Sequence, residues 1–185
     1  MEITGERKIN AKRTIVFAAL NDVDILQKAI PGCEEVSKES YNEFTGAVVA
    51  KVGPIKSKFI GKASLENVLP PKSYTIMGEG KGGPAGNVKV SAQVDLKEEQ
   101  LTTTISYVVN AKITGKLAQL GGPIVQKTVE KLSEKFFNNL QTILDGESEE
   151  KNDSAPELSS SASKVKPFLI LVAIAALGYL TYLVI

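Results

Sequence analysis

The sequence predicts an α+β domain in which a curved antiparallel sheet wraps around one long helix, followed by an apolar segment that crosses a membrane. Segments of alternating apolar and polar residues, divided by turn residues, fill the middle of the chain. A strongly amphipathic stretch of about five helical turns follows them. The last eighteen residues carry no charge. These three patterns together predict the class of fold.

The sheet and two short helices account for the first two thirds of the domain. Alternation predicts a first strand over 2–10, and the next residues predict helices over 14–20 and 22–29, the second capped by Asn21 or Asp22. Period-two alternation then predicts six strands, near 33–39, 42–52, 55–66, 72–80, 87–97 and 101–112. Because their connections are short, we expect an antiparallel meander.

The domain ends with the long helix. Its apolar residues recur at steps of three and four, and they are Val125, Val129, Leu132, Phe136, Leu140 and Ile143. A stripe this regular needs an apolar partner, and the concave face of the sheet supplies one. We expect the helix to end near Gly146, so that the domain covers residues 1–145.

Small residues on the inward faces of the strands predict an apolar cavity under the helix. Glycine and alanine alternate with larger residues in three strands, at Gly61 and Ala63, at Gly78 and Gly80, and at Ala92. The alternative is that phenylalanines of the helix fill this space. The residues expected to line the cavity are Phe59, Ile76, Val90, Val94, Ile105, Tyr107, Val129, Leu132 and Phe136. Alternation alone does not fix which face of each strand points inward, so a shift of one residue would place the opposite set of side chains in the cavity.

Composition excludes several classes of function. The chain has no histidine, which excludes Ser–His and Cys–His catalysis and the usual zinc sites, and its one cysteine makes a transition-metal site untenable. Residues 1–145 hold 19 Lys and Arg against 16 Asp and Glu, a net charge of +3 that is too small to indicate nucleic-acid binding. We therefore expect no metal, no covalent cofactor, no nucleic acid and no catalytic residue.

Two further features have alternative interpretations. Residues 78–83, GEGKGG, match a phosphate-binding pattern, but no helix opens after them, so they form either a simple hairpin turn or a mobile loop at a cavity mouth. Lys56, Lys58 and Lys62 share one strand face. That face is either solvated or a docking patch for an acidic partner or lipid headgroups.

The C-terminal segments predict a tail anchor. Residues 146–167 are acidic and serine-rich, and we expect them to form a disordered linker. Residues 168–185 would span roughly 27 Å as a helix, close to the thickness of a bilayer core. Lys164 and Lys166 before this helix, with no secretory signal at the N-terminus, predict a single-pass membrane protein whose domain faces the cytoplasm.

Five ordered motifs in residues 1–145 resemble the CoxG family, named for the G subunit of carbon monoxide dehydrogenase. They are IPGCE at 30–34, VGPIKSKF at 52–59, GEGKGG at 78–83, GKLAQLG at 115–121 and FF at 136–137. The resemblance implies a START-like, helix-grip fold with an apolar ligand cavity. It also implies association with molybdenum-containing dehydrogenases and delivery of a quinone between such an enzyme and the membrane.

The sequence thus favours a non-enzymatic, membrane-anchored carrier or anchoring subunit. Its partners would be the lipid bilayer, a hydrophobic small molecule (a quinone or a lipid) and a molybdenum-type dehydrogenase. Two alternatives remain. One is a polyketide-cyclase-like enzyme, in which Tyr107 or a buried carboxylate would have to act because histidine is absent. The other is an assembly factor for a partner oxidoreductase.

Overall fold

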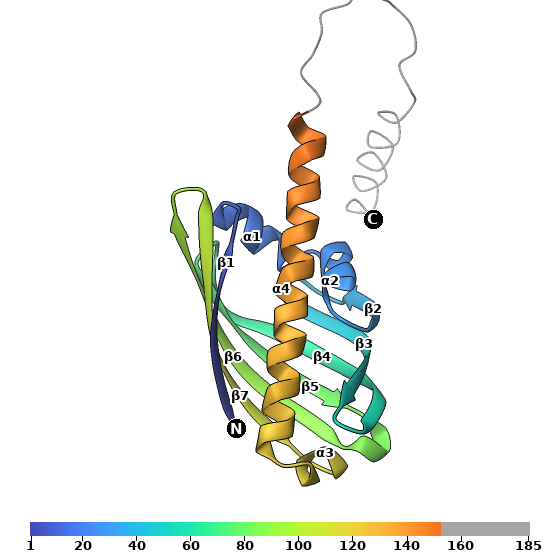
Figure 1. Ribbon diagram of the computed structural model, residues 1–185. Helices are drawn as coiled ribbons and strands as arrows, with labels where there is room; N and C mark the ends of the chain where they lie inside the picture. The colour runs from blue at the N-terminus through green and yellow to red at the C-terminus, as the bar shows by residue number, and fades with distance from the viewer. Residues whose placement is uncertain (153–185) are drawn as a thin grey trace, which may run out of the picture. The chain divides into compact units, whose positions relative to one another are not determined.

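Seven antiparallel strands form one curved sheet in the computed structural model, which describes residues 1–152 (Figure 1). The strands are β1 (Glu2–Ile9), β2 (Cys33–Lys38), β3 (Glu43–Val52), β4 (Ile55–Leu69), β5 (Ser73–Lys81), β6 (Asn87–Glu99) and β7 (Thr102–Ile113). Their order across the sheet is β1-β7-β6-β5-β4-β3-β2. Each strand from β2 to β7 therefore pairs with its neighbour in sequence, and β1 closes the far edge against β7. The predicted meander is confirmed.

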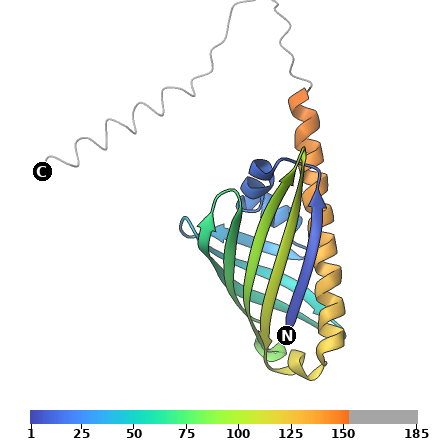
Figure 2. The same cartoon turned by 90° about the vertical axis from the view of Figure 1, so that its left-hand side faces the viewer.

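A long helix, α4 (Gly122–Asn152), lies along the concave face of the sheet, as Figures 1 and 2 show from two sides. Two short helices, α1 (Arg13–Ala19) and α2 (Val23–Ala29), sit at the upper end of the sheet in Figure 1, and α3 (Lys116–Gln119) sits at the lower end. A short 3₁₀ turn, η1 (Gly83–Ala85), joins β5 to β6. Met1–Asp153 form one compact unit with its own sheet and core, so this part of the chain can be studied alone.

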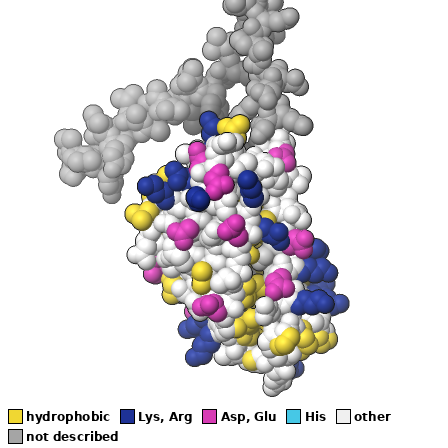
Figure 3. Space-filling model, turned by 60° about the vertical axis from the view of Figure 1, so that its left-hand side comes forward, with side chains coloured by type: hydrophobic (Ala, Val, Ile, Leu, Met, Phe, Trp, Pro, Cys, Tyr) yellow, Lys and Arg dark blue, Asp and Glu magenta, His cyan; other side chains and the backbone are white. Residues whose placement is uncertain are grey.

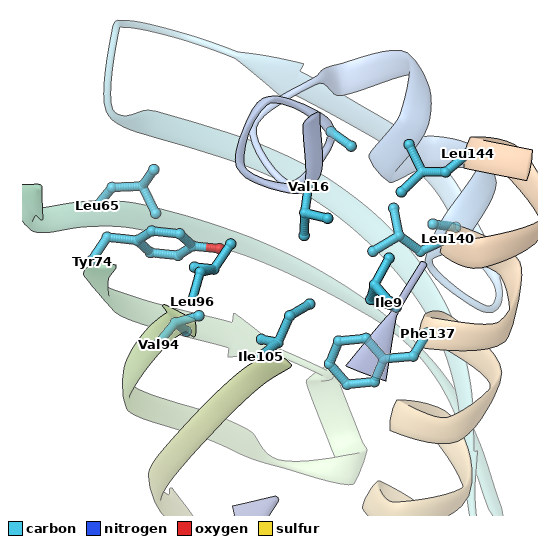
Figure 4. Packing of buried hydrophobic residues seen from close by; sticks show 12 residues of the cluster. Ile9, Val16, Leu65, Tyr74, Val94, Leu96, Ile105, Phe137, Leu140 and Leu144 are labelled. Atoms are coloured by element: carbon cyan, nitrogen blue, oxygen red, sulfur yellow. The ribbon is translucent and has the colours of Figure 1, made fainter. Parts of the chain in front are cut away.

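The hydrophobic core fills the upper end, between the sheet, α1 and the second half of α4 (Figure 4). Val16 and Leu140 have no exposed surface, and Ile9 and Ile105 are each 2% exposed. Asn139 on α4 donates a hydrogen bond of 3.1 Å from Nδ2 to the carbonyl oxygen of Ala29, which fixes α2 against the long helix. The Asp22 carboxylate accepts from the backbone N–H of Ile25 at 3.0 Å and caps α2 as the sequence predicts.

The main departures from the predicted elements occur at the ends of α4. The helix begins at Gly122, with Pro123 in its first turn. Proline is tolerated there because the backbone N–H that it lacks would have no hydrogen-bond partner within the helix. It continues to Asn152 and does not end near Gly146. Gly146 does not stop it because the next residues, ESEEKN, include several good helix formers. The helices α3 and η1 are too short to give a periodic pattern and were not expected.

The first seven residues of the predicted linker, 146–152, therefore belong to α4. Residues 153–167 of that linker and the whole predicted anchor, 168–185, lie outside the described residues. Within residues 1–152, no helix combines the length and the apolarity that crossing a bilayer requires.

Candidate ligand-binding cavity

A cavity of about 560 Å³ lies between the concave face of the sheet and the first half of α4. Its walls are almost entirely apolar. The strands β3 to β7 contribute Phe44, Val48, Ala50, Val52, Phe59, Ala63, Leu65, Tyr74, Ile76, Val88, Val90, Val109, Ala111 and Ile113, and the helices contribute Leu20, Leu26, Leu117, Val125 and Val129. The structure thus contains the apolar cavity that the small inward-facing residues predict.

A row of glycines creates the space. Gly46 on β3 lies opposite Gly61 on β4, and Gly61 lies opposite Gly80 on β5. Three adjacent strands therefore present no side chain at this level of the concave face, and α4 cannot close the resulting gap. A Cβ atom built on Gly80 would meet no other atom within 4 Å, whereas one on Gly78 would lie 2.9 Å from Cγ2 of Val90. Gly80 is therefore the glycine that faces the open part of the cavity.

The two ends of the cavity are lined by different elements. Leu20, Leu26 and Ile30 line it at the upper end, beside α1 and α2. Leu117 of α3 and Val125 of α4 line it at the lower end. Gly82, in the glycine loop, packs so closely on the ring of Phe59 that an added Cβ would lie 2.3 Å from Cε1. The loop before η1 therefore contacts a cavity wall at the lower end, and Ala85 within η1 is 4% exposed.

The structure brings together four of the nine residues predicted to line the cavity: Phe59, Ile76, Val90 and Val129. The other five face inward but do not line it. Val94 and Ile105 belong to the core cluster, and Tyr107 and Phe136 pack against that cluster. Leu132 is half-buried on α4. Tyr107 stacks on Phe137 with ring centroids 5.8 Å apart. These aromatic rings therefore lie with the packed core at the upper end and do not enter the cavity.

Sequence reasoning missed the contribution of β3 and of the short helices. Val48, Ala50 and Val52 alternate along β3 on the same face as Gly46, so the glycine signal used for the other strands could have identified them. Leu20, Leu26 and Ile30 could not be found this way, because a residue in or directly after a short helix reaches the cavity only through the tertiary packing of that helix.

Tyr74 is the most deeply buried polar side chain on the cavity wall. It is 4% exposed, and its ring meets that of Phe17 edge to face at 5.7 Å. Burial raises the pKa of its phenol well above the ordinary value. The hydroxyl group forms no hydrogen bond with any described residue, and Figure 4 shows the ring extending inward from β5 over the core. The phenol is thus neutral and available to a bound molecule.

The remaining chemistry of the described residues is sparse. Cys33 has a pKa raised by burial, which makes its thiol a poor nucleophile. No group of three or more His, Cys, Asp or Glu side chains within residues 1–152 could hold a metal ion. Lys62 and Glu79, which border the cavity, form an ion pair of 3.4 Å with each other. The site can bind an apolar molecule by excluding water.

The family model for CoxG, the G subunit of carbon monoxide dehydrogenase, matches residues 5–145. No curated protein matches the chain in sequence. Among solved structures, a conserved protein from Geobacillus kaustophilus is 23% identical over 79% of this chain and 96% of its own, with a TM-score of 0.75. A START superfamily protein from Mycobacterium smegmatis is 10% identical over 78% of this chain and 97% of its own, with a TM-score of 0.60. These similarities confirm the START-like fold.

Proposed function

The chain belongs to the CoxG family of carbon monoxide dehydrogenase, and we propose that it is a non-catalytic carrier that holds an apolar molecule, a quinone or a lipid, in its cavity. The observation that carries this proposal is the cavity of about 560 Å³ with its apolar wall and its floor of aligned glycines. Cavities that bind small molecules in proteins are commonly about 300–1,000 Å³ and mostly apolar. The START-like fold is consistent with a carrier.

Burial of apolar surface supplies the binding energy in this proposal, at roughly 25 cal/mol for each Å² removed from water. The wall offers few polar groups, so a ligand with several charges would lose its hydration without compensation. This favours a molecule that is mostly hydrocarbon, such as an isoprenoid quinone or an acyl lipid.

The second part of the proposal concerns the membrane and a partner enzyme. The apolar sequence of residues 168–185 supports a C-terminal anchor, with the domain on the cytoplasmic side and 153–167 as its tether. Such a tether has a root-mean-square span of roughly 20 Å if it is flexible. The family description names a subunit of carbon monoxide dehydrogenase, and on this basis we propose a molybdenum-type dehydrogenase as the enzyme that the carrier links to the bilayer.

The alternative of a polyketide-cyclase-like enzyme receives no support from the geometry. Tyr107, one of the two groups that this alternative could use beside a buried carboxylate, stacks on Phe137 and does not line the cavity. The carrier therefore remains the function that the site supports best.

The proposal is tested by extracting the full chain, purified from its native membranes, with organic solvent and identifying the extract by mass spectrometry. We expect close to one quinone or lipid molecule per chain. A chain without bound ligand would contradict the carrier, and co-purification of an intact dehydrogenase with that empty chain would favour the assembly factor.

A further inference from the structure

Four segments that are distant in sequence meet at the lower end of the domain. They are the β3–β4 turn at Gly53, the η1 loop, α3 and the start of α4. A Cβ on Gly53 would lie 3.1 Å from Cγ2 of Ile124 on α4. The backbone N–H of Thr114 donates to the carbonyl oxygen of Asn87 at 2.9 Å. These contacts make the lower end one continuous surface.

This surface is strongly basic. Residues 44–64, 80–94 and 100–129, which contain the turns at this end together with much of the strands that lead to them, hold nine lysines and no aspartate or glutamate. Six of these lysines lie at or beside the turns and are all exposed, and we call them the basic end: Lys51, Lys56, Lys81, Lys112, Lys116 and Lys127. The acidic residues toward this end in the described chain include Glu2, Glu34, Glu79 and Glu130. Glu34 is paired with Lys58 at 2.7 Å and Glu79 with Lys62, and Glu130 accepts from Gln126 at 3.1 Å.

Two pairs of these lysines oppose each other directly across the sheet. Lys51 on β3 lies opposite Lys56 on β4, and Lys89 on β6 lies opposite Lys112 on β7. Like charges in directly opposed positions destabilise a sheet. Lys51, Lys56 and Lys112 form no ion pair with any described residue, and Lys89 lies 3.9 Å from Glu79. The arrangement costs stability in the isolated domain and would be relieved by an anionic partner.

Apolar side chains are exposed among these lysines. Ile124 is 44% exposed and Met1 is 42% exposed. Figure 3 shows hydrophobic and basic side chains gathered at the lower end of the domain. The cavity also reaches this end, since Val52 and Leu117 line it there. By contrast, the upper end carries both signs of charge, with Asp22, Asp24 and Lys28 on or beside α2.

We propose that the basic end docks on an anionic phospholipid surface and presents the lower end of the cavity to the bilayer. The lysines would meet the headgroups, and Ile124 and Met1 would enter the boundary between headgroups and acyl chains. Charge complementarity and adjacent exposed apolar side chains next to an apolar cavity favour a lipid surface over an acidic protein. This inference rests on the proposed carrier function, for which it supplies the site of ligand exchange.

The test measures sedimentation of residues 1–153, which lack the C-terminal apolar segment, with vesicles of phosphatidylcholine and with vesicles that also contain phosphatidylglycerol. We expect binding to the anionic vesicles that weakens as salt is added. The double variant Lys51→Gln, Lys56→Gln should bind roughly thirtyfold more weakly. The matched control, Lys28→Gln with Lys72→Gln, removes the same charge from the upper end and should bind as the unmodified domain does.

Equal binding to both kinds of vesicle, or equal weakening by both double variants, would overturn the docking proposal. A third result would also overturn it: no binding to either kind of vesicle, together with loss of a co-purifying dehydrogenase when Lys51 and Lys56 are replaced. The lysines would then bind an acidic protein. Folding is checked by thermal unfolding, where removal of the opposed lysine pair should not lower stability. Each of these failures leaves the carrier proposal intact, because that proposal is judged by the ligand extracted from the full chain.

Discussion

At the scale of single residues, Tyr74 shows how the cavity differs from an ordinary core. The Tyr74 side chain is 4% exposed, and its hydroxyl forms no hydrogen bond with a described residue. The hydroxyl oxygen is nevertheless not among the fully buried side-chain atoms that lack a partner, so it keeps contact with the open space of the cavity. The domain therefore carries a polar group on the cavity wall that a ligand oxygen could satisfy.

We predict that the free energy of unfolding of Tyr74→Phe at neutral pH lies within about 1 kcal/mol of that of the unmodified domain, since no hydrogen bond is lost. The substitution should have a larger effect on how the free energy of unfolding depends on pH. Burial keeps the phenol protonated in the folded state, whereas the unfolded chain releases the proton above about pH 10. The unfolded state then binds fewer protons, so stability falls as pH rises past that value.

Urea unfolding at several alkaline pH values measures this effect. The unmodified domain should lose stability more steeply than Tyr74→Phe, and Tyr41→Phe serves as control because Tyr41 is 79% exposed. Identical slopes for all three proteins would contradict the burial of an ionisable phenol at position 74.

At the scale of elements, the two halves of α4 have different roles. Leu140 and Leu144 in the second half are 0% and 3% exposed and belong to the core cluster. Val125 and Val129 in the first half line the cavity. One continuous apolar stripe therefore packs tightly at one end and covers an open space at the other.

We predict that Leu140→Ala lowers the free energy of unfolding by about 2–5 kcal/mol, because it creates a new void in a packed core. Val129→Ala should cost about 1 kcal/mol or less, because it only widens an existing cavity. Val16→Ala, at a core valine with no exposed surface, is the matched substitution and should cost more than Val129→Ala. Equal losses at Val16 and Val129 would mean that the cavity is closed in solution.

The elements follow closely from local patterns in the sequence, but the site follows only in part. Alternation places Val90 and Val94 on the same face of β6, and the structure confirms this. It cannot say that Val90 meets the cavity while Val94 meets the core, because that depends on where α4 and α1 cross the sheet. The glycines carried part of the missing information, since Gly46, Gly61 and Gly80 align across strands and all three line the cavity.

The ends of elements were less predictable for a related reason. Gly146 looks like a helix terminator in sequence, but glycine ends a helix only when the chain turns there, and α4 continues to Asn152. The helices α3 and η1 bury Leu117 and Ala85 against the lower end of the domain, where these side chains are 3% and 4% exposed. This burial comes from the tertiary structure.

At the scale of the whole molecule, the domain is divided along its length. The upper end is a packed core with both signs of charge around it, and the lower end is an apolar cavity surrounded by lysines. A carrier needs this division, because one end must hold the fold while the other exchanges a ligand. The central claim is therefore that the cavity is occupied by an apolar molecule when the protein works.

The most direct test of that claim is the ligand content of Gly80→Phe in the full chain, extracted and quantified by mass spectrometry beside the unmodified protein and Met77→Phe. A side chain at position 80 would enter the open cavity without meeting another atom at its Cβ, whereas Met77 is 39% exposed on the opposite face of β5 and does not line the cavity. We predict that Gly80→Phe keeps its melting temperature but retains almost no quinone or lipid, while Met77→Phe retains close to one molecule per chain. Full ligand content in a folded Gly80→Phe would contradict the assignment of the cavity as the binding site.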